Sequence, residues 1–146
     1  MSTLEWVGFR IQNGQLACTD HLLKKIQRFP RPSTQRENMV FLGLCQFFMR
    51  FVPHYAEIAA PLTELNQASM RHGFAAYWKD PQETAYINLV SALNHPPVLA
   101  LFDEDKTIRV ETDASDIGMG AALMQKDDQG TWHPVEYWSK KFNSAQ

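Results

Sequence analysis

The sequence predicts an α+β fold: an N-terminal hairpin and a helical part, followed by one more helix and an antiparallel meander. The pair Asn13-Gly14 lies between two strand-like runs and favours a type I′ hairpin, because both central residues need a positive φ. Apolar residues at helical spacing fill much of residues 20–94. From Val98 onward the pattern changes to strand-like runs with short connections, which is typical of an antiparallel meander.

The N-terminal part begins with a predicted strand over Trp6–Ile11 and a return strand over Gln15–Cys18. A short helix is predicted over Asp20–Gln27, capped by its first residue. Pro30 and Pro32 then predict an extended linker, because each proline removes a backbone donor and restricts the residue before it.

Two helices are predicted in the next segment. Thr34 and Glu37 have the spacing of a capping box, so a helix is expected to start there and to run to Val52. A second helix is expected over His54–Gln67, where Pro61 predicts a kink or two short pieces. The first of these helices is apolar over most of its circumference, with one expected stripe made of Val40, Leu44, Phe47 and Phe51.

The C-terminal half is predicted as a loop, a helix and four strands. Residues 68–79 mix small and polar residues and indicate a loop. Asp80-Pro81 is a good cap and first-turn pair for a helix that Pro96-Pro97 ends. The turn-forming residues 127–130 separate the last two strands, so the adjacent aspartates there are expected in a solvated hairpin. The expected strands are Val98–Phe102, Thr107–Glu111, Ile117–Gln125 and Trp132–Trp138.

Composition excludes several classes of protein. The 146 residues are 45% hydrophobic and carry a net charge of −2, so packing is expected and no global basic field indicates nucleic acid. Cys18 and Cys45 are expected to be reduced and buried, since no secretory leader is recognisable. We therefore expect a protein of the cytoplasm or nucleus, with no membrane span.

A set of short motifs occurs in an order that resembles the Pol polyprotein of gypsy-type LTR retrotransposons. The resemblance covers nearly the whole chain, from the end of the reverse transcriptase palm into the start of the RNase H domain. The motifs are Val7-Gly8-Phe9, Phe29-Pro30-Arg31-Pro32, Phe41-Leu42-Gly43-Leu44, Ala59-Ala60-Pro61-Leu62-Thr63, Pro97-Val98-Leu99, Thr112-Asp113-Ala114-Ser115 and His133-Pro134-Val135.

The resemblance implies four segments. Residues 1–32 would be the palm-end hairpin, short helix and linker, and residues 33–67 the thumb-like helices. Residues 68–97 would be a connection with a helix, and residues 98–146 truncated strands of an incomplete RNase H-like fold. The parent activities would be RNA-directed DNA synthesis and hydrolysis of the RNA strand of an RNA–DNA hybrid.

Asp113 is the catalytic and metal-binding residue that the resemblance implies. It would be the first RNase H carboxylate and a ligand of Mg²⁺, which takes oxygen ligands and usually more than one carboxylate. Glu111 is expected on the other face of its strand, and the family's remaining ligands are expected beyond Gln146. No Tyr-x-Asp-Asp turn of a palm occurs. The alternative role for Asp113 is a strand-end aspartate that caps the turn through Ser115 and Asp116.

A small basic group precedes the thumb-like helices. In the family this region contacts the backbone of primer and template, an interaction that depends on salt and not on sequence. The alternative is an ordinary solvated helix face. The candidate nucleic-acid-binding residues are Lys24, Lys25, Arg28, Arg31, Arg36 and Arg50.

The leading interpretation is a fragment of a reverse transcriptase/RNase H that is inactive alone, holds no Mg²⁺ stably and at most binds a duplex. Its partners would be an RNA–DNA hybrid or DNA duplex backbone, the palm and fingers, and the remaining RNase H segments. The alternative is a retroelement-derived binding or scaffold module with a protein or nucleic-acid partner, since the apolar helix Thr34–Val52 needs a cover. A third possibility is an unstable remnant without function.

Overall fold

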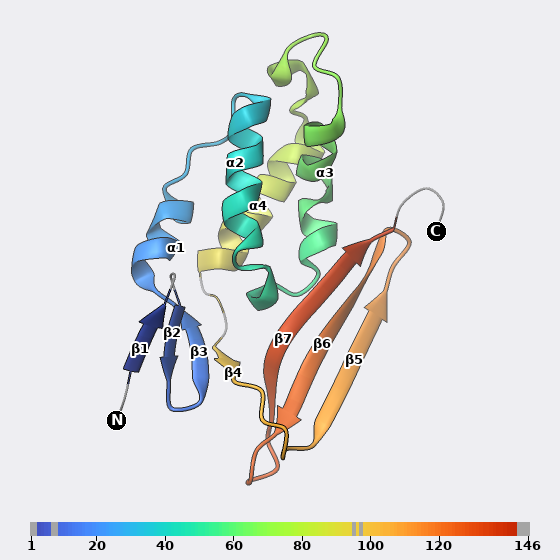
Figure 1. The fold of residues 1–146 in the computed structure, drawn as a ribbon. Coiled ribbons are helices and arrows are strands. Elements are labelled where there is room, and N and C mark those ends of the chain that lie inside the picture. The colour runs from blue at the N-terminus through green and yellow to red at the C-terminus, as the bar shows by residue number, and fades with distance from the viewer. Residues whose placement is uncertain (1–2, 7–8, 95, 97, 143–146) are drawn as a thin grey trace.

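The computed structural model describes residues 3–6, 9–94, 96 and 98–142. Val7, Gly8 and Pro97, which belong to the predicted motifs, lie outside the described residues. The described residues form a helical group above two small antiparallel sheets, one with the strand order β1-β2-β3-β4 and one with the order β5-β6-β7 (Figure 1). This arrangement confirms the predicted α+β class.

The first sheet contains the predicted hairpin, with one correction. Asn13 and Gly14 have φ values of 53° and 72°, as a type I′ turn requires. The single strand predicted over Trp6–Ile11 is wrong, because Trp6 pairs with Phe9 across a reversal of the chain. The strands of this hairpin region are β1 (Thr3–Trp6), β2 (Phe9–Gln12) and β3 (Gln15–Cys18).

Strand β4 (Leu99–Ala100) joins the first sheet and not the later meander, which corrects a second prediction. It is also shorter than the run Val98–Phe102 that the sequence indicates. Leu99 pairs with Leu16 of β3, and both side chains are buried. Burial of this leucine pair in the core explains why β4 leaves its sequence neighbours, since apolar burial outweighs local connectivity.

The described helices are short and close to their predicted positions. Thr19, and not Asp20, occupies the N-cap position of the first helix. No described helix is long and apolar enough to cross a membrane. Within the predicted loop 68–79 a short 3₁₀ turn forms. The helices are α1 (Asp20–Gln27), α2 (Gln35–Gln46), η1 (Met49–Phe51), α3 (Tyr55–Gln67), η2 (Phe74–Tyr77) and α4 (Asp80–Asn94).

The cap of α2 is confirmed, and its length is not. Thr34 Oγ1 accepts a hydrogen bond from the Glu37 backbone N at 3.1 Å. The Glu37 carboxylate in turn accepts hydrogen bonds from the backbone N and the hydroxyl of Ser33, which lower the pKa of Glu37. The α-helix ends at Gln46, and the chain continues through a turn into η1 instead of reaching Val52 as one helix.

The buried face of α2 also differs from the predicted stripe. Val40 is 49% exposed and Phe47 is 44% exposed, although both were expected to face the core. The residues that α2 and the following turn bury are Phe41, Leu42, Cys45, Phe48 and Phe51. Because α2 packs against α1 on one side and α3 on the other, its buried face follows these neighbours and not the single most regular apolar stripe.

Helix α3 is continuous through Pro61, so the alternative of two short pieces is wrong. The proline removes only the hydrogen bond that residue 61 would donate to the carbonyl of Glu57. Leu62 and Leu65 are buried directly after it. Asn38 of α2 donates to the carbonyl of Leu62 at 2.8 Å, so α2 and α3 are joined by a buried polar contact as well as by packing.

The second sheet confirms the predicted meander. It is formed by β5 (Ile108–Ala114), β6 (Gly118–Lys126) and β7 (Trp132–Lys141), all antiparallel. The Asp127 turn is confirmed as well, since its Oδ1 accepts from the backbone N of Gln129 and of Thr131. The hydrogen bond from His133 is the main reason that the pKa of Asp127 is lowered.

Both cysteines are free and buried, as predicted, and burial raises the pKa of each thiol to about 12. Because the thiolate is the reactive form, we expect both thiols to react with a disulfide reagent at neutral pH roughly a thousandfold more slowly than a free cysteine. Absorbance assays of thiol release, without and with denaturant, measure this. Rapid labelling of Cys45 in the native protein would contradict the buried position.

Candidate functional site

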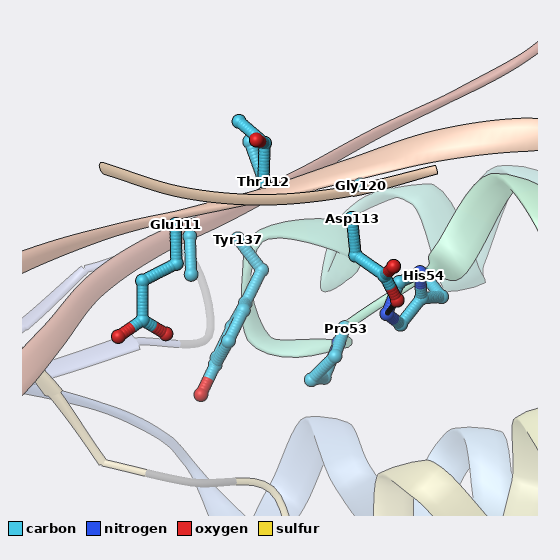
Figure 2. Close-up of a pocket in the computed structure, with 9 residues that line it drawn as sticks. Pro53, His54, Glu111, Thr112, Asp113, Gly120 and Tyr137 are labelled. Carbon is cyan, nitrogen blue, oxygen red and sulfur yellow. Dashed lines mark ion pairs between the residues drawn. The ribbon is translucent and has the colours of Figure 1, made fainter. Parts of the chain in front are cut away.

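A hollow of about 270 Å³ lies between the second sheet and the start of α3 (Figure 2). The sheet side is formed by β5, β6 and β7, and the helical side by the two residues before α3. It contains the one residue for which the resemblance implies catalysis. The lining residues are Pro53, His54, Glu111, Thr112, Asp113, Gly120, Ala121, Ala122 and Tyr137.

Asp113 lies within β5 and points toward the start of α3 (Figure 2). Its Oδ2 is 3.6 Å from His54 Nε2, and its side chain is 79% exposed. Ser115, and not Asp113, organises the following turn, because the Ser115 hydroxyl accepts from the Ile117 backbone N and the Ser115 backbone N donates to the Gly118 carbonyl. The carboxylate of Asp113 therefore faces a different part of the fold and does not cap its own turn.

Glu111 lies on the same face of β5 as Asp113, so its predicted placement on the other face is wrong. Figure 2 shows Glu111 and Asp113 directed to one side and Thr112 to the opposite side. Side chains alternate along a strand, so residues two apart share a face. Glu111 is engaged by Arg109, whose Nη2 is 2.7 Å from the Glu111 Oε1.

The resemblance implies Mg²⁺ as the ion of this site, and the carboxylates of this hollow fit that ion poorly. Mg²⁺ requires near-octahedral oxygen ligation and is usually held by more than one carboxylate with waters. Asp113 faces a histidine, and the neighbouring carboxylate of Glu111 is paired with Arg109. Across residues 3–6, 9–94, 96 and 98–142, no three His, Cys, Asp or Glu side chains are grouped to hold a metal ion.

His54 is the residue in this hollow that the sequence did not single out. It takes the N-cap position of α3 in a left-handed conformation, with φ 57° and ψ 31°. Its Nδ1 is buried without a hydrogen-bond partner and lies 3.9 Å from Glu57 Oε1, too far for a hydrogen bond. The sequence feature that corresponds to this contact is the glycine at position 120. A side chain there would collide with His54, because a Cβ would lie 2.8 Å from His54 Nδ1.

The six basic candidates do not form one group. Arg31 pairs with Glu83 of α4, and Arg50 lies 3.8 Å from Glu136 of β7. Arg36 is exposed in the first turn of α2. The other three lie together on the last turn and C-cap of α1, where they are exposed, and they are Lys24, Lys25 and Arg28.

The fold and the sequence are both similar to those of reverse transcriptases. Residues 78–146 match the family described as the RNase H-like domain found in reverse transcriptase. A structure of the foamy viral protease-reverse transcriptase in complex with dsDNA matches with a TM-score of 0.81 and 27% identity, over 99% of this chain and 29% of that one. A second, in complex with an RNA/DNA hybrid, matches with a TM-score of 0.77 and 27% identity, over 97% and 19%. The chain is therefore similar in fold to a segment of reverse transcriptase, and its residues 78–146 are similar in sequence to an RNase H-like domain.

Similar proteins of known origin are retrotransposon polyproteins. The Tf2-3 and Tf2-4 polyproteins of Schizosaccharomyces pombe are each 34% identical to this chain over 146 residues, or 99% of its length. The chain spans only 11% of the length of these polyproteins. The resemblance to retrotransposon polyproteins is thereby confirmed, in the region where reverse transcriptase is joined to an RNase H-like domain.

Proposed function

We propose that this chain is a duplex-binding segment of a retroelement reverse transcriptase, and that it catalyses neither polymerisation nor RNA hydrolysis by itself. The observation that carries the binding part is the exposed basic turn of α1, formed by Lys24, Lys25 and Arg28. In the part of the chain that the structure describes, no acidic side chain forms an ion pair with these three.

Unpaired basic side chains on one helical turn suit a phosphate backbone. Each such contact releases condensed counterions, which gives affinity without reading the sequence. The similar foamy viral structures are complexes with dsDNA and with an RNA/DNA hybrid, which supports the same class of ligand for this chain. Arg31 and Arg50 contribute less in this proposal, because carboxylates already engage them.

The absence of catalysis is proposed from the carboxylates. Hydrolysis of a hybrid by two metal ions requires several acidic ligands around the scissile phosphate. Asp113 contacts His54, and Glu111 is paired with Arg109, so neither stands free beside the other for shared metal binding. Turnover of a labelled hybrid in Mg²⁺ that disappears in Asp113→Asn would contradict this part of the proposal.

Neutralising the basic turn of α1 is expected to weaken duplex binding uniformly across sequences. For the triple variant Lys24→Gln, Lys25→Gln and Arg28→Gln, the negative slope of log affinity against log salt should become shallower. Its magnitude should decrease by about 0.9 for each phosphate that the protein no longer neutralises. Fluorescence anisotropy with a DNA duplex and an RNA–DNA hybrid measures both affinity and slope. The control is Arg71→Gln, an exposed arginine in the loop before η2. An unchanged slope in the triple variant would exclude α1 as the binding face.

A second candidate function is a scaffold that binds a further segment of the same polyprotein. The observation that favours it is the second sheet, where Ile108 and Val110 of β5 and Trp138 of β7 are exposed, with β6 between the two strands. The chain spans 11% of the length of its relatives, so those polyproteins contain much further sequence that could supply a cover for this face. Concentration-dependent binding of the adjoining polyprotein segment, abolished by Val110→Lys, would support this function.

A further inference from the structure

The first turn of α3 contacts each strand of the second sheet. On β7, Ser139 Oγ accepts a hydrogen bond from the backbone N of Ala56 at 2.7 Å. Directly after β5, Ser115 Oγ donates to Glu57 Oε1 at 3.0 Å. Within β5, Asp113 lies 3.6 Å from His54, whose ring lies over β6 at Gly120. Three polar contacts and one close approach therefore converge on residues 54–57.

Two glycines of β6 allow this approach. A Cβ at Gly118 would lie 3.1 Å from Glu57 Cγ, and a Cβ at Gly120 would lie 2.8 Å from His54 Nδ1. Real side chains do not tolerate such separations without a shift of the neighbour. The absence of side chains at Gly118 and Gly120 is explained by the first turn of α3 lying against β6.

His54 is held in a conformation that a residue with a Cβ rarely adopts. Its φ of 57° lies in the left-handed region, which costs free energy unless the surroundings compensate. The His54 side chain makes no hydrogen bond to cap α3, and it is directed at the sheet instead. The residue with the left-handed backbone therefore lies at the contact between α3 and the sheet.

We propose that Asp113 and Ser115 of the Thr112–Ser115 motif act in this chain as a docking element, which seats the β5–β7 sheet on the first turn of α3, with Asp113 facing His54 in place of a divalent cation. The motif then fixes the orientation of the sheet relative to the thumb-like helices. The inference rests on contacts within the chain and does not depend on the proposed binding of a duplex.

The test uses the backbone N–H of Ala56 as a reporter, because its acceptor lies on the sheet. Amide hydrogen exchange by NMR is compared for Ser115→Ala, Glu57→Ala and the double variant of the full chain. Each single variant should speed the exchange of Ala56 by roughly threefold to tenfold, and the double variant should be no faster than the faster single one. Asp116→Ala, in the same turn but outside these contacts, should leave the rate unchanged, and Ser115→Thr, which keeps the hydroxyl, should restore it.

If the increase in the Ala56 exchange rate in the double variant equals the product of the two single increases, the docking role of Ser115 is overturned. An unchanged exchange rate in both single variants would overturn it as well. The amide of Leu42 in the core of α2 serves as an internal control, since faster exchange there would report general unfolding and not the release of α3 from the sheet.

A second measurement tests the cation. The thermal unfolding midpoint is followed for the unmodified chain and for Asp113→Asn with and without millimolar MgCl₂. The proposal expects Mg²⁺ to shift both proteins equally. A midpoint that Mg²⁺ raises in the unmodified chain and not in Asp113→Asn would show that Asp113 binds the ion and would overturn the proposal. Because no duplex is present, this result is independent of the test of duplex binding.

Discussion

Replacing Phe41 with alanine is expected to lower the free energy of unfolding by about 3–5 kcal/mol, the largest effect of any substitution proposed for this chain. Phe41 is fully buried in α2. Its ring centroid lies 5.6 Å from that of Phe29 in the linker and 5.3 Å from that of Tyr86 in α4. Tyr86 also donates from its hydroxyl to the Phe29 carbonyl at 2.8 Å, so the three rings join the linker, α2 and α4.

Chemical denaturation followed by circular dichroism measures this destabilisation. Removing the ring leaves a cavity among three segments that the Tyr86–Phe29 hydrogen bond keeps in place, so relaxation of the neighbours can refill only part of it. The matched control is Met39→Ala in the same helix, where the side chain is 55% exposed and a change within about 0.5 kcal/mol is expected. Equal effects of the two variants would mean that α2 is not packed as described.

The sequence predicted the helices of this core close to their observed positions, but it predicted the length and the buried face of α2 wrongly. Local signals placed the Thr34 cap and the Asn13-Gly14 turn, because both depend on residues adjacent in the chain. The apolar stripe of α2 was misassigned because nearly every side of that helix is apolar. In such a helix the burial pattern is decided by tertiary neighbours, which periodicity does not reveal.

The candidate site shows the same division. Asp113 was predicted from the resemblance, and the structure places it beside the start of α3. His54 was not predicted, because its role depends on a contact between residues 59 positions apart in the chain. Glu111 was predicted on the wrong face of β5, although side-chain alternation along a strand puts residues two apart on the same face, as it does Glu111 and Asp113. Long-range pairing of strands and helices is thus the part of the site that local sequence patterns do not contain.

Two glycine-to-alanine substitutions should change stability in opposite directions. Gly118→Ala is expected to lower the free energy of unfolding by about 1–3 kcal/mol, since its Cβ would lie 2.7 Å from the Lys140 carbonyl oxygen. That oxygen belongs to the backbone of the neighbouring strand, so it can move only if β6 and β7 shift together. Gly118 does not have a positive φ, and the effect therefore reports packing and not backbone conformation.

Gly43→Ala is the matched comparison and is expected to raise the free energy of unfolding by about 0.5–1 kcal/mol. Gly43 is exposed within α2, and a Cβ there would meet nothing within 4 Å. The same methyl group thus gains helix propensity at one site and forces two strands apart at the other. Urea denaturation of both variants measures the difference. A stabilised Gly118→Ala protein would mean that β6 and β7 do not approach as closely as the structure shows. It would also contradict the close contact between α3 and this sheet.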